Sequence, residues 1–347
     1  MIDRNDEIRR VLITGISGSG GRCLLEYLRA EHSGVEVHGA VRRKASRRGL
    51  DAVLHEVDLL DFGSIVQCLR RSRPDAIFHL AANSDKGFEI PTAMLLNNTV
   101  GSANLLEAVR LERGECLEPI GKRSPYEMGV RNFDPVVVVV SSSEVYGDVR
   151  PEDVPITEEC PMRPVSPYAI SKMAEDHLGR LYNRAYGLKT VVTRAFSYIN
   201  FRHPSIFTTA FARQIAEIEQ GKREFLEHGN LDSVRTFVDT RDIMHAYWLA
   251  ATRCRFGEAY NIGGTATMSV REVLGKLITL SGQHPEAARW TPVWTERDPT
   301  LLRPVDVTQQ IPCSDKFIAE TGWERRFNID ESIRGLLDHW RKEVVRG

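Results

Sequence analysis

Three side chains in the middle of the chain could together move a proton to or from an oxygen atom of a substrate. Tyr168 and Lys172 are four residues apart, so on a helix they lie one above the other on one face. An ammonium beside a phenol lowers the pKa of the phenol, which could then donate or accept a proton near neutral pH. Ser142 ends a valine-rich run and would supply a hydroxyl that holds the reacting oxygen. Because Tyr-x-x-x-Lys is common in helices, this interpretation depends on the elements around it.

A cluster of glycines near the start of the chain could bind the pyrophosphate of a dinucleotide. Gly15, Gly18 and Gly21 follow a strand predicted over 9–14 and open a helix predicted over 18–30. Small residues let the backbone approach a pyrophosphate, and the N–H groups and dipole of a helix N-terminus favour negative charge. A tight strand-to-helix turn would also use glycine, but the position after a first strand favours dinucleotide binding. The other loop residues expected to contact the cofactor are Ser17, Ser19 and Gly20.

The end of the second predicted strand, 35–41, indicates which dinucleotide is bound. Sites selective for NAD usually carry an acidic residue there, which bonds the ribose 2′-hydroxyl. This chain has Arg42 and Arg43, whose guanidinium groups suit the additional 2′-phosphate of NADP, although a solvated basic loop is the alternative interpretation. Asp58 and Leu59, after the third strand, would bond the adenine. We therefore predict NADP as the cofactor, with NAD as the alternative.

The elements that must position these residues alternate along the first half of the chain. Nearly continuous apolar strands separated by amphipathic helices are typical of a parallel sheet covered on both faces. Strands are predicted over 9–14, 35–41, 52–58, 76–82, 136–140 and 190–195, and helices over 18–30, 61–72, 92–110 and 167–186. We predict an α/β fold: a doubly wound parallel Rossmann sheet with a smaller mixed α/β substrate-binding domain.

The pattern also suggests where the chain passes between the two domains. The Rossmann domain is predicted over 1–196 with a return at about 236–264, and the second domain over 197–235 and 265–347. After Ala195 polar loops are expected to dominate until a helix near 240–251. The charged, aperiodic segment at about 111–134 is interpreted as an inserted surface loop.

Composition excludes several classes of protein. The 347 residues are 42% hydrophobic and 27% charged, which is ordinary for a globular protein, and the net charge of −1 gives no electrostatic signature for nucleic acid or acidic membranes. The six cysteines form no Cys-x-x-Cys pair and the ten histidines show no metal-ligand spacing, so no disulfide framework or metal site is expected. The charged opening MIDRNDEIRR is unlike a signal peptide, and the longest aliphatic run is far shorter than the ~20 residues of a membrane span. We predict a cytoplasmic protein.

Taken together, these residues resemble the extended short-chain dehydrogenase/reductases that modify nucleotide-diphosphate sugars. The resemblance runs over almost the whole chain. It includes the glycine motif, His79-Leu80-Ala81-Ala82, Asn98 opening N-x-x-G-S-x-N-L-L-E-A, Ser142-Ser143-Glu144-Val145-Tyr146-Gly147 and Ser166-Pro167-Tyr168-x-x-x-Lys172, then Arg241-Asp242, Tyr260-Asn261, Arg303-Pro304 and Thr321-Gly322-Trp323. It implies that Leu80, Ala81, Ala82 and Asn98 contact the cofactor together with Tyr168 and Lys172.

Within that family, the chain is similar to the GDP-mannose 4,6-dehydratases and the GDP-4-keto-6-deoxymannose reductases. The run VHGAVRR resembles the dehydratases, whose paired arginines face the NADP phosphate, and HGNLDSVR (His228–Arg235) resembles a segment that lines the GDP site in both groups. The runs FTTAFARQIAEIEQGK and MRPVSPYAISK are more similar to the reductases. The resemblance thus implies a GDP-linked sugar but leaves dehydratase and reductase both open.

Glu144 is the residue that bears on this choice. The dehydratases oxidise the sugar at C4, eliminate water across C5 and C6 and return the hydride to C6, and a Glu two residues after the catalytic hydroxyl residue serves that elimination. Ser142-Ser143-Glu144 matches this pattern with Ser in place of Thr, whereas a C4 epimerase typically has no carboxylate there. The reductases also often show Ser-Ser-Glu, so Glu144 permits dehydration without proving it. A Glu that bonds a backbone turn is the structural alternative.

The chain departs from the family where the substrate is expected to bind. The usual Phe-Asn-His is Phe196-Ser197-Tyr198 here, and the dehydratase Arg of F-V-T-R-K is replaced by Ala210 or shifted to Arg213. Arg235 and Arg303 could clamp the diphosphate with two hydrogen bonds each, with surface salt bridges as the alternative. The predicted substrate-binding residues are Ser84, Ser143, Ser197, Asn200, Arg213, Asn230, Arg235 and Arg303.

We therefore expect an NADP-dependent nucleotide-sugar enzyme that acts through a 4-keto intermediate. The first hypothesis is a GDP-mannose 4,6-dehydratase-like lyase with Ser142, Glu144, Tyr168 and Lys172 as its catalytic residues. A GDP-4-keto-6-deoxy-hexose reductase is the alternative, followed by a C4 epimerase and a non-catalytic NADP-binding sensor. The resemblance implies a homodimer or homotetramer. Its partners would be the nucleotide-diphosphate-sugar substrate and further copies of the chain, with no nucleic acid, membrane or metal.

Overall fold

The computed structural model describes residues 2–42, 49–83, 90–114, 133–203, 206–282, 294–302, 305 and 307–346. Three of the predicted site residues, Arg43, Ser84 and Arg303, lie outside these ranges, as does most of the segment interpreted as an insertion. Among the described residues, no helix is both long enough and apolar enough to cross a membrane.

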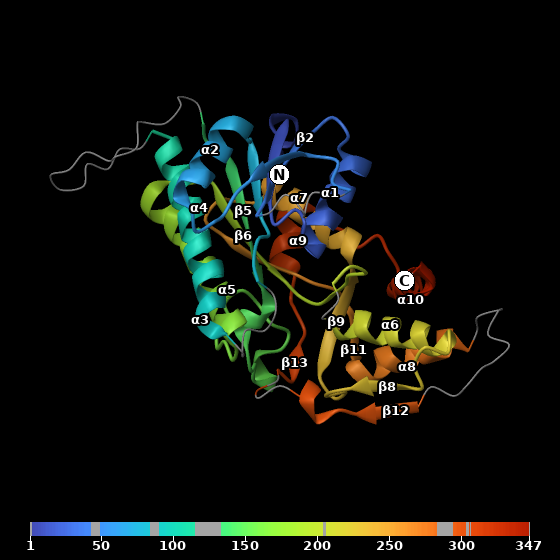
Figure 1. The fold of residues 1–347 in the computed structure, drawn as a ribbon. Helices are drawn as coiled ribbons and strands as arrows, with labels where there is room; N and C mark the ends of the chain where they lie inside the picture. The colour runs from blue at the N-terminus through green and yellow to red at the C-terminus, as the bar shows by residue number, and fades with distance from the viewer. Residues whose placement is uncertain are drawn as a thin grey trace.

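A parallel sheet of seven strands forms the larger region, as predicted (Figure 1). Its order is β10-β6-β5-β4-β1-β2-β3, so the chain starts in the middle, moves outward to one edge and returns to build the other. The strands are β1 (Arg10–Thr14), β2 (Glu36–Val41), β3 (Val53–Glu56), β4 (Ala76–His79), β5 (Val136–Ser142), β6 (Thr190–Ala195) and β10 (Ala259–Ile262). The direction of the chain reverses between β1 and β4, and the carboxyl ends of these two strands therefore flank a ligand crevice.

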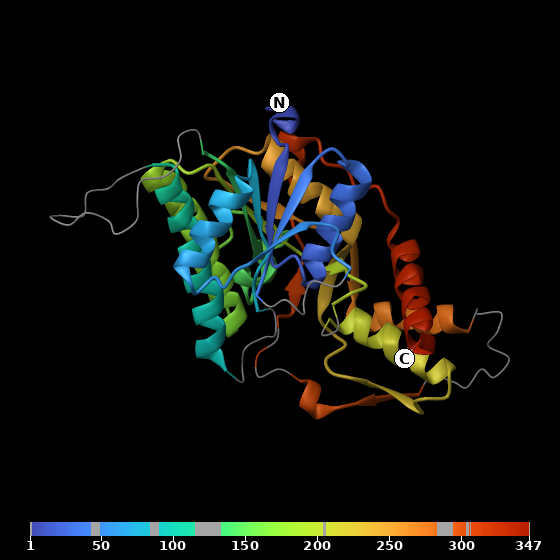
Figure 2. The same cartoon turned by 45° about the horizontal axis from the view of Figure 1, so that its top comes forward.

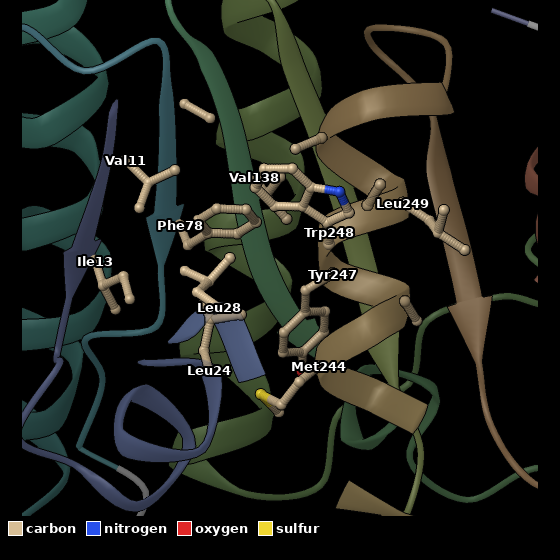
Figure 3. Packing of buried hydrophobic residues seen from close by; sticks show 14 of the residues in the cluster. Val11, Ile13, Leu24, Leu28, Phe78, Val138, Met244, Tyr247, Trp248 and Leu249 are labelled. Atoms are coloured by element: carbon tan, nitrogen blue, oxygen red, sulfur yellow. The ribbon is translucent and has the colours of Figure 1, made fainter. Parts of the chain in front are cut away.

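Helices cover both faces of this sheet, which explains why its strands are apolar throughout. On one face lie α2 (Phe62–Ser72), α4 (Gly101–Glu112) and α5 (Pro167–Tyr186), and on the other lie α1 (Ser19–Glu31), α7 (Thr240–Arg253) and α9 (Asp315–Thr321). Figure 3 shows Val11, Phe78 and Val138 of three neighbouring strands facing Leu28 of α1 and Trp248 of α7. The sheet is thus rigidly packed, and its strand ends are fixed positions for functional side chains.

A short helical segment leads into α4 on the α5 side of the sheet. It consists of α3 (Pro91–Leu95) and one π-helical stretch, η3 (Leu96–Val100), which continues into α4 without a break. The sequence predicted one helix over 92–110. The structure has a continuous helical segment there, with a wider π-helical turn at η3. Asn98 lies in this widened turn and is buried.

A second region follows directly from the carboxyl end of β6. Its first sheet contains β7 (Tyr198–Ile199), β9 (Val234–Asp239), β11 (Ala266–Ser269) and β13 (Gln309–Gln310), and its second pairs β8 (Phe225–His228) with β12 (Trp294–Arg297). Three helices pack with them: α6 (Phe207–Glu219), α8 (Val270–Ser281) and α10 (Ile329–Arg346). Figures 1 and 2 show this region next to the sheet rather than on either of its helical layers.

The expectation that polar loops dominate between Ala195 and the helix near 240 was wrong. Residues 207–219 form a helix whose apolar side, including Phe211 and Ile215, is buried against α8 and α10. The strands of this region are two to six residues long and pair with partners distant in sequence. Strands this short carry little periodicity of their own, which is why the pattern looked like loops.

Residues near the end of the chain pack against the seven-stranded sheet. Phe317 of α9 and Trp323 pack in the same buried cluster as the sheet, although their positions fall within the predicted second domain. The Trp323 indole donates to the Asp242 carbonyl at the start of α7. The domain boundaries by residue number remain a prediction, but the core of the Rossmann region clearly includes residues from the end of the chain.

Candidate active site

Ser142 and Tyr168 lie together where β5 ends and α5 begins. Ser142 is the last residue of β5, and its hydroxyl accepts a hydrogen bond from the Glu144 backbone N–H at 3.2 Å. Tyr168 is in the first turn of α5, which Ser166 caps by accepting from the Ala169 N–H at 3.0 Å. The Tyr168 and Ser142 side chains are hydrogen-bonded to each other. The chain therefore holds a phenol and a hydroxyl in contact at the carboxyl edge of the sheet, as the sequence indicated.

Lys172 lies one turn after Tyr168 and is almost fully buried, with 3% of its surface exposed. Its ammonium donates to the Val140 carbonyl at 2.8 Å and to the Glu175 carboxylate at 2.9 Å. The ammonium nitrogen is 6.0 Å from the centre of the Tyr168 ring. Much of the positive charge expected to act on the phenol is therefore shared with a carboxylate.

The pKa of Tyr168 is raised from its ordinary value, contrary to the expectation of a phenol that titrates near neutral pH. Burial is the largest cause, because it disfavours the charged phenolate, and the negative charges of Glu175 and Glu144 add to it. The hydrogen bond with Ser142 acts in the opposite direction. A raised pKa favours the neutral phenol, the form that can donate a proton.

The glycine loop brings the backbone of β1 unusually close to its neighbours. Gly15 has a φ of +72°, and a Cβ placed there would be 2.8 Å from the Ala81 backbone. A Cβ at Gly21 would be 2.3 Å from the Gly15 carbonyl oxygen. Among the described residues, no side chain caps the N-terminus of α1, and the first turn of this helix carries no acidic residue. These features fit a bound pyrophosphate, whose negative charge the helix N-terminus favours.

The segment after β4 completes this crevice. Ala81 donates its backbone N–H to the Thr14 hydroxyl at 3.3 Å, so the predicted residues Leu80, Ala81 and Ala82 lie beside the glycine loop. Below them, the His79 ring bridges the hydroxyls of Thr14 and Ser102, both at 2.7 Å. Burial and the nearby Lys172 charge lower the pKa of His79 to about 3, so the imidazole is neutral and serves as a fixed brace.

Asn98 connects the crevice to α5. Its amide oxygen accepts from the Asn83 N–H at 2.7 Å, and its amide nitrogen donates to the Asn83 carbonyl and to the Ser171 hydroxyl. Asn98 thus fixes the end of the 80–83 segment against the helix that carries Tyr168 and Lys172. Its contact with the cofactor stays a prediction. In the structure, its side-chain amide forms hydrogen bonds with Asn83 and Ser171.

The remaining predicted cofactor residues lie along the ends of β2 and β3. Arg42 follows β2 and is exposed. The Asp58 carboxylate accepts from the Leu60 N–H at 2.9 Å, and the Leu59 carbonyl accepts from the Asn104 amide at 2.8 Å. Both residues therefore shape the turn before α2 at the carboxyl edge of the sheet, where an adenine would be expected.

The structure does not gather all the predicted substrate residues. Ser143 follows Ser142 and is buried, and Ser197 follows β6. Asn200 is fully buried, and its side-chain oxygen accepts from the Arg202 N–H. Asn230 has its amide group in a local turn with Asp232 and Ser233.

Two predicted arginines have very different surroundings. The Arg235 guanidinium is buried and donates to the Val234 carbonyl at 2.9 Å and to the Val307 carbonyl at 2.8 Å. It therefore holds the strand segment that follows the predicted Arg303. Arg213 is exposed and lines a hollow of about 740 Å³ on the second region, together with Lys222, Arg223 and Glu343. No residue of the Ser142–Tyr168 site lines that hollow.

Comparison with known proteins places this arrangement in a family. A family model described as GDP-mannose 4,6 dehydratase matches residues 12–336. The chain belongs to that family. This confirms the resemblance to the extended short-chain dehydrogenase/reductases that the motifs indicated.

Individual members of the family match nearly the full chain. It is 28% identical over 340 residues to a GDP-6-deoxy-D-mannose reductase of Pseudomonas aeruginosa, covering 97% of this chain and 98% of the relative. It is 26% identical over 367 residues to a GDP-mannose 4,6-dehydratase of Vibrio cholerae, covering 95% and 93%. Family membership is thus secure, while both reaction types occur among relatives of similar distance.

Solved structures lead to the same fold. The structure of RMD from Pseudomonas aeruginosa complexed with NADPH superimposes with a TM-score of 0.78 at 27% identity, covering 96% of this chain and 99% of that one. A UDP-glucose 4-epimerase of Thermus thermophilus in complex with NAD gives 0.77, also at 27% identity, with coverage of 96% and 99%. The predicted doubly wound fold is confirmed.

In this family member, two residues near the site were not assigned from the sequence. Glu175 pairs with Lys172, and the signal that could have revealed it is the i,i+3 spacing on the same helix. The Tyr198 hydroxyl is 3.8 Å from the position a Cβ would take on Gly20, so Tyr198 reaches the glycine loop. The sequence signal for Tyr198 was the replacement of the usual Phe-Asn-His by Phe196-Ser197-Tyr198, from which no role for the tyrosine was inferred.

Proposed function

We propose that this protein binds NADP(H) in the crevice between the glycine loop and the 80–83 segment. The close approach at Gly15 and Gly21 and the uncapped start of α1 support the pyrophosphate position. Arg42, exposed at the end of β2, supports the 2′-phosphate of NADP over NAD. A nicotinamide held there would carry the hydride. Titration with NADPH and NADH, followed by the fluorescence of the reduced nicotinamide, should give the lower Kd for NADPH.

The substrate we propose is a GDP-linked hexose, and the reaction is a 4,6-dehydration through a 4-keto intermediate. Tyr168 would exchange a proton with the C4 oxygen, and the Ser142 hydroxyl would orient that oxygen. Glu144 would take the C5 proton and assist the loss of the C6 hydroxyl. The observation that carries this proposal is the position of Glu144: its backbone N–H donates to the Ser142 hydroxyl at 3.2 Å, and its charge is one of the causes that raise the pKa of Tyr168.

The test is to incubate the protein with GDP-mannose and a catalytic amount of NADP. Dehydration predicts a product lighter by one water, with no net consumption of NADP. Unchanged GDP-mannose would contradict the proposal. A parallel incubation with dTDP-glucose tests the base, since a product from that substrate alone would overturn the GDP assignment but keep the reaction.

One observation favours a second candidate, the reduction of a GDP-4-keto-6-deoxy sugar. Burial raises the pKa of Tyr168, which favours its neutral phenol form, and reduction of a ketone needs one hydride on carbon and one proton on oxygen, which such a phenol can give. The 28% identity to a relative named as a reductase points the same way. Stoichiometric loss of NADPH absorbance with the 4-keto substrate would identify this activity, and its absence would exclude it.

We also propose that the protein is a homodimer formed through η3 and α5. Large apolar side chains are exposed on these neighbouring helices: Leu96 (49%) and Val100 (41%) one turn apart on η3, and Ile170 (43%) and Leu181 (52%) on α5. Ile170 and Leu181 are three turns apart and share a face of α5. Light scattering should give twice the monomer mass, and Leu181→Glu should shift it to a monomer. A monomeric native protein would contradict this.

A further inference from the structure

Tyr198 of β7 reaches from the second region to the glycine loop, in a segment where the chain departs from its family. It pairs with Val238 of β9 and is partly buried. Its hydroxyl oxygen is 3.8 Å from the position that a Cβ on Gly20 would take, and the Leu80 Cδ2 is 3.3 Å from the same position. Apart from the adjoining stretch of the chain, no other described atom lies within 4 Å of it. The absence of a side chain on Gly20 therefore leaves room for the phenol hydroxyl beside the first turn of α1.

A second contact shows that this approach belongs to the packing of the whole segment. The Asn200 side-chain oxygen accepts from the Cys23 thiol of α1, with 3.9 Å between oxygen and sulfur. Gly20 and Cys23 are three residues apart and share one face of that helix. Ile199 is buried in the core of the second region. Tyr198 and Asn200 therefore both lie against the start of α1, while the residue between them points away from it.

These two side chains bring hydrogen-bond donors to the start of α1. The Asn200 amide nitrogen is fully buried and makes no hydrogen bond of regular geometry among the described residues. Burial raises the pKa of Tyr198, and the Asn200 amide, acting as a donor toward the phenol oxygen, works in the opposite direction. A phenol hydroxyl can accept one hydrogen bond and donate another. With the amide on its accepting side, the Tyr198 hydroxyl keeps its hydrogen for a further acceptor.

The order of the strands indicates which half of a dinucleotide would supply that acceptor. Tyr198 follows β6, which neighbours β5, the strand that ends at Ser142. The predicted adenine residues Asp58 and Leu59 follow β3, on the other side of β1. Tyr198 therefore approaches the first turn of α1 from the side of Ser142 and Tyr168. In a dinucleotide bound across this crevice, the nicotinamide half lies on that side.

We propose that Tyr198 is a cofactor-binding residue whose hydroxyl donates a hydrogen bond to a phosphate oxygen on the nicotinamide side of the bound pyrophosphate. The contact rests on the proposed binding of NADP(H), because it needs the pyrophosphate at the glycine loop. The N–H groups in the first turn of α1 face the phosphates from one side and favour their charge. Tyr198 adds a neutral donor from the second region, so the bound cofactor is held by both regions.

The test compares Tyr198→Phe with the native protein in calorimetric titrations of two probes. NADPH carries both phosphates of the pyrophosphate, whereas adenosine 2′,5′-bisphosphate lacks the nicotinamide half. Loss of a hydrogen bond to a charged phosphate should raise the Kd for NADPH about tenfold and leave the Kd for the bisphosphate unchanged. The fold should persist, because phenylalanine keeps the ring that packs beside α1. An unchanged Kd for NADPH, or an equal rise for both probes, would overturn the proposal.

Tyr182→Phe is the matched control. The Tyr182 hydroxyl donates to the Glu107 carboxylate at 3.2 Å, at a place on α5 about 21 Å along the helix from Tyr168. This substitution removes a phenol hydroxyl far from the glycine loop and should leave both Kd values unchanged. A rise in the Kd for NADPH as large as that of Tyr198→Phe would show a general effect of losing a hydroxyl and would overturn the proposal.

The same titrations separate this contact from the binding on which it rests. A native protein that binds no NADPH would contradict both the proposed cofactor and the role of Tyr198. A native protein that binds NADPH no more tightly than Tyr198→Phe would contradict only the role of Tyr198 and leave the proposed cofactor in place.

Discussion

The two regions of this protein hold their polar residues in different ways. In the seven-stranded sheet, Gly15, the 80–83 segment and Ser142 follow directly from the carboxyl ends of buried strands, so the backbone itself sets their positions. In the second region, Arg235 is held by carbonyl groups from two separate segments, and Arg213 faces a hollow away from the site. The difference indicates that backbone geometry positions the predicted cofactor-binding residues, whereas the predicted substrate-binding residues depend on individual side chains from short elements.

The largest loss of activity is expected from removing the phenol hydroxyl of the sheet region. Tyr168→Phe should lower kcat by about 1,000-fold, within the range that general acid–base groups contribute. The fold and the NADPH affinity should persist, because the ring still fills its place beside Ser142. Steady-state kinetics with a nucleotide sugar, together with a fluorescence titration of NADPH, measures both. A loss of less than tenfold would remove Tyr168 from the reaction.

Replacing the carboxylate beside Ser142 should give a smaller and more selective loss. Glu144→Gln is expected to slow dehydration of GDP-mannose by about 100-fold, while oxidation at C4 continues and reduced nicotinamide accumulates on the protein. Mass spectrometry of the product and absorbance of the reduced nicotinamide distinguish the two steps. Glu152→Gln, at an exposed carboxylate nearby, is the control and should match the native rate. Release of the 4-keto-6-deoxy sugar at the native rate by Glu144→Gln would refute this role.

Adding a single methyl group at Gly21 should test whether close backbone contacts form the predicted cofactor-binding loop. In Gly21→Ala, the new Cβ would be 2.3 Å from the Gly15 carbonyl oxygen and 2.6 Å from the Ile16 Cα, both backbone atoms that cannot rotate away. The free energy of unfolding should fall by about 1–3 kcal/mol, with a weaker affinity for NADPH. Gly34→Ala has nothing within 4 Å and should change neither quantity. Equal effects of the two substitutions in denaturant unfolding would contradict this account of the loop.

A substitution in the second region is expected to weaken substrate binding more than it slows the chemical step. Arg235→Ala should raise the KM for the nucleotide sugar by about 10-fold, with a smaller change in kcat, because it removes charge-assisted hydrogen bonds that position the segment after residue 306. Arg271→Ala, which removes an exposed pair with Asp232, is the control. An unchanged KM in Arg235→Ala would show that this arginine does not act on the substrate site.

The same contrast explains how far the sequence could be interpreted. The helix that carries Tyr168 and the strand after it were predicted with their actual bounds, because long apolar runs, a Ser-Pro start and a following glycine identify their ends. The helix over 207–219 was missed as an element, since its amphipathic pattern is flanked by strands too short to show one. The extended family and the sheet were therefore predictable, and the packing of the second region was not.

The site itself was predicted in its parts but not in its electrostatics. The spacing of Tyr168 and Lys172 correctly predicts that they share a helix face, and from that spacing a lowered phenol pKa seemed to follow. The direction is reversed because burial disfavours the phenolate, and the negative charges of Glu175 and Glu144 add to this effect. Burial and the choice of ion-pair partner are properties of the packed molecule, so spacing alone could not supply them.

The most direct test of the central claim is the reaction of GDP-mannose with catalytic NADP in deuterated water. A 4,6-dehydratase removes the C5 proton and later replaces it from solvent, so the product should be lighter by one water and carry one deuterium on carbon, at C5. It should form with the native protein and not with Tyr168→Phe. Recovery of unchanged GDP-mannose without carbon-bound deuterium would contradict the dehydratase assignment.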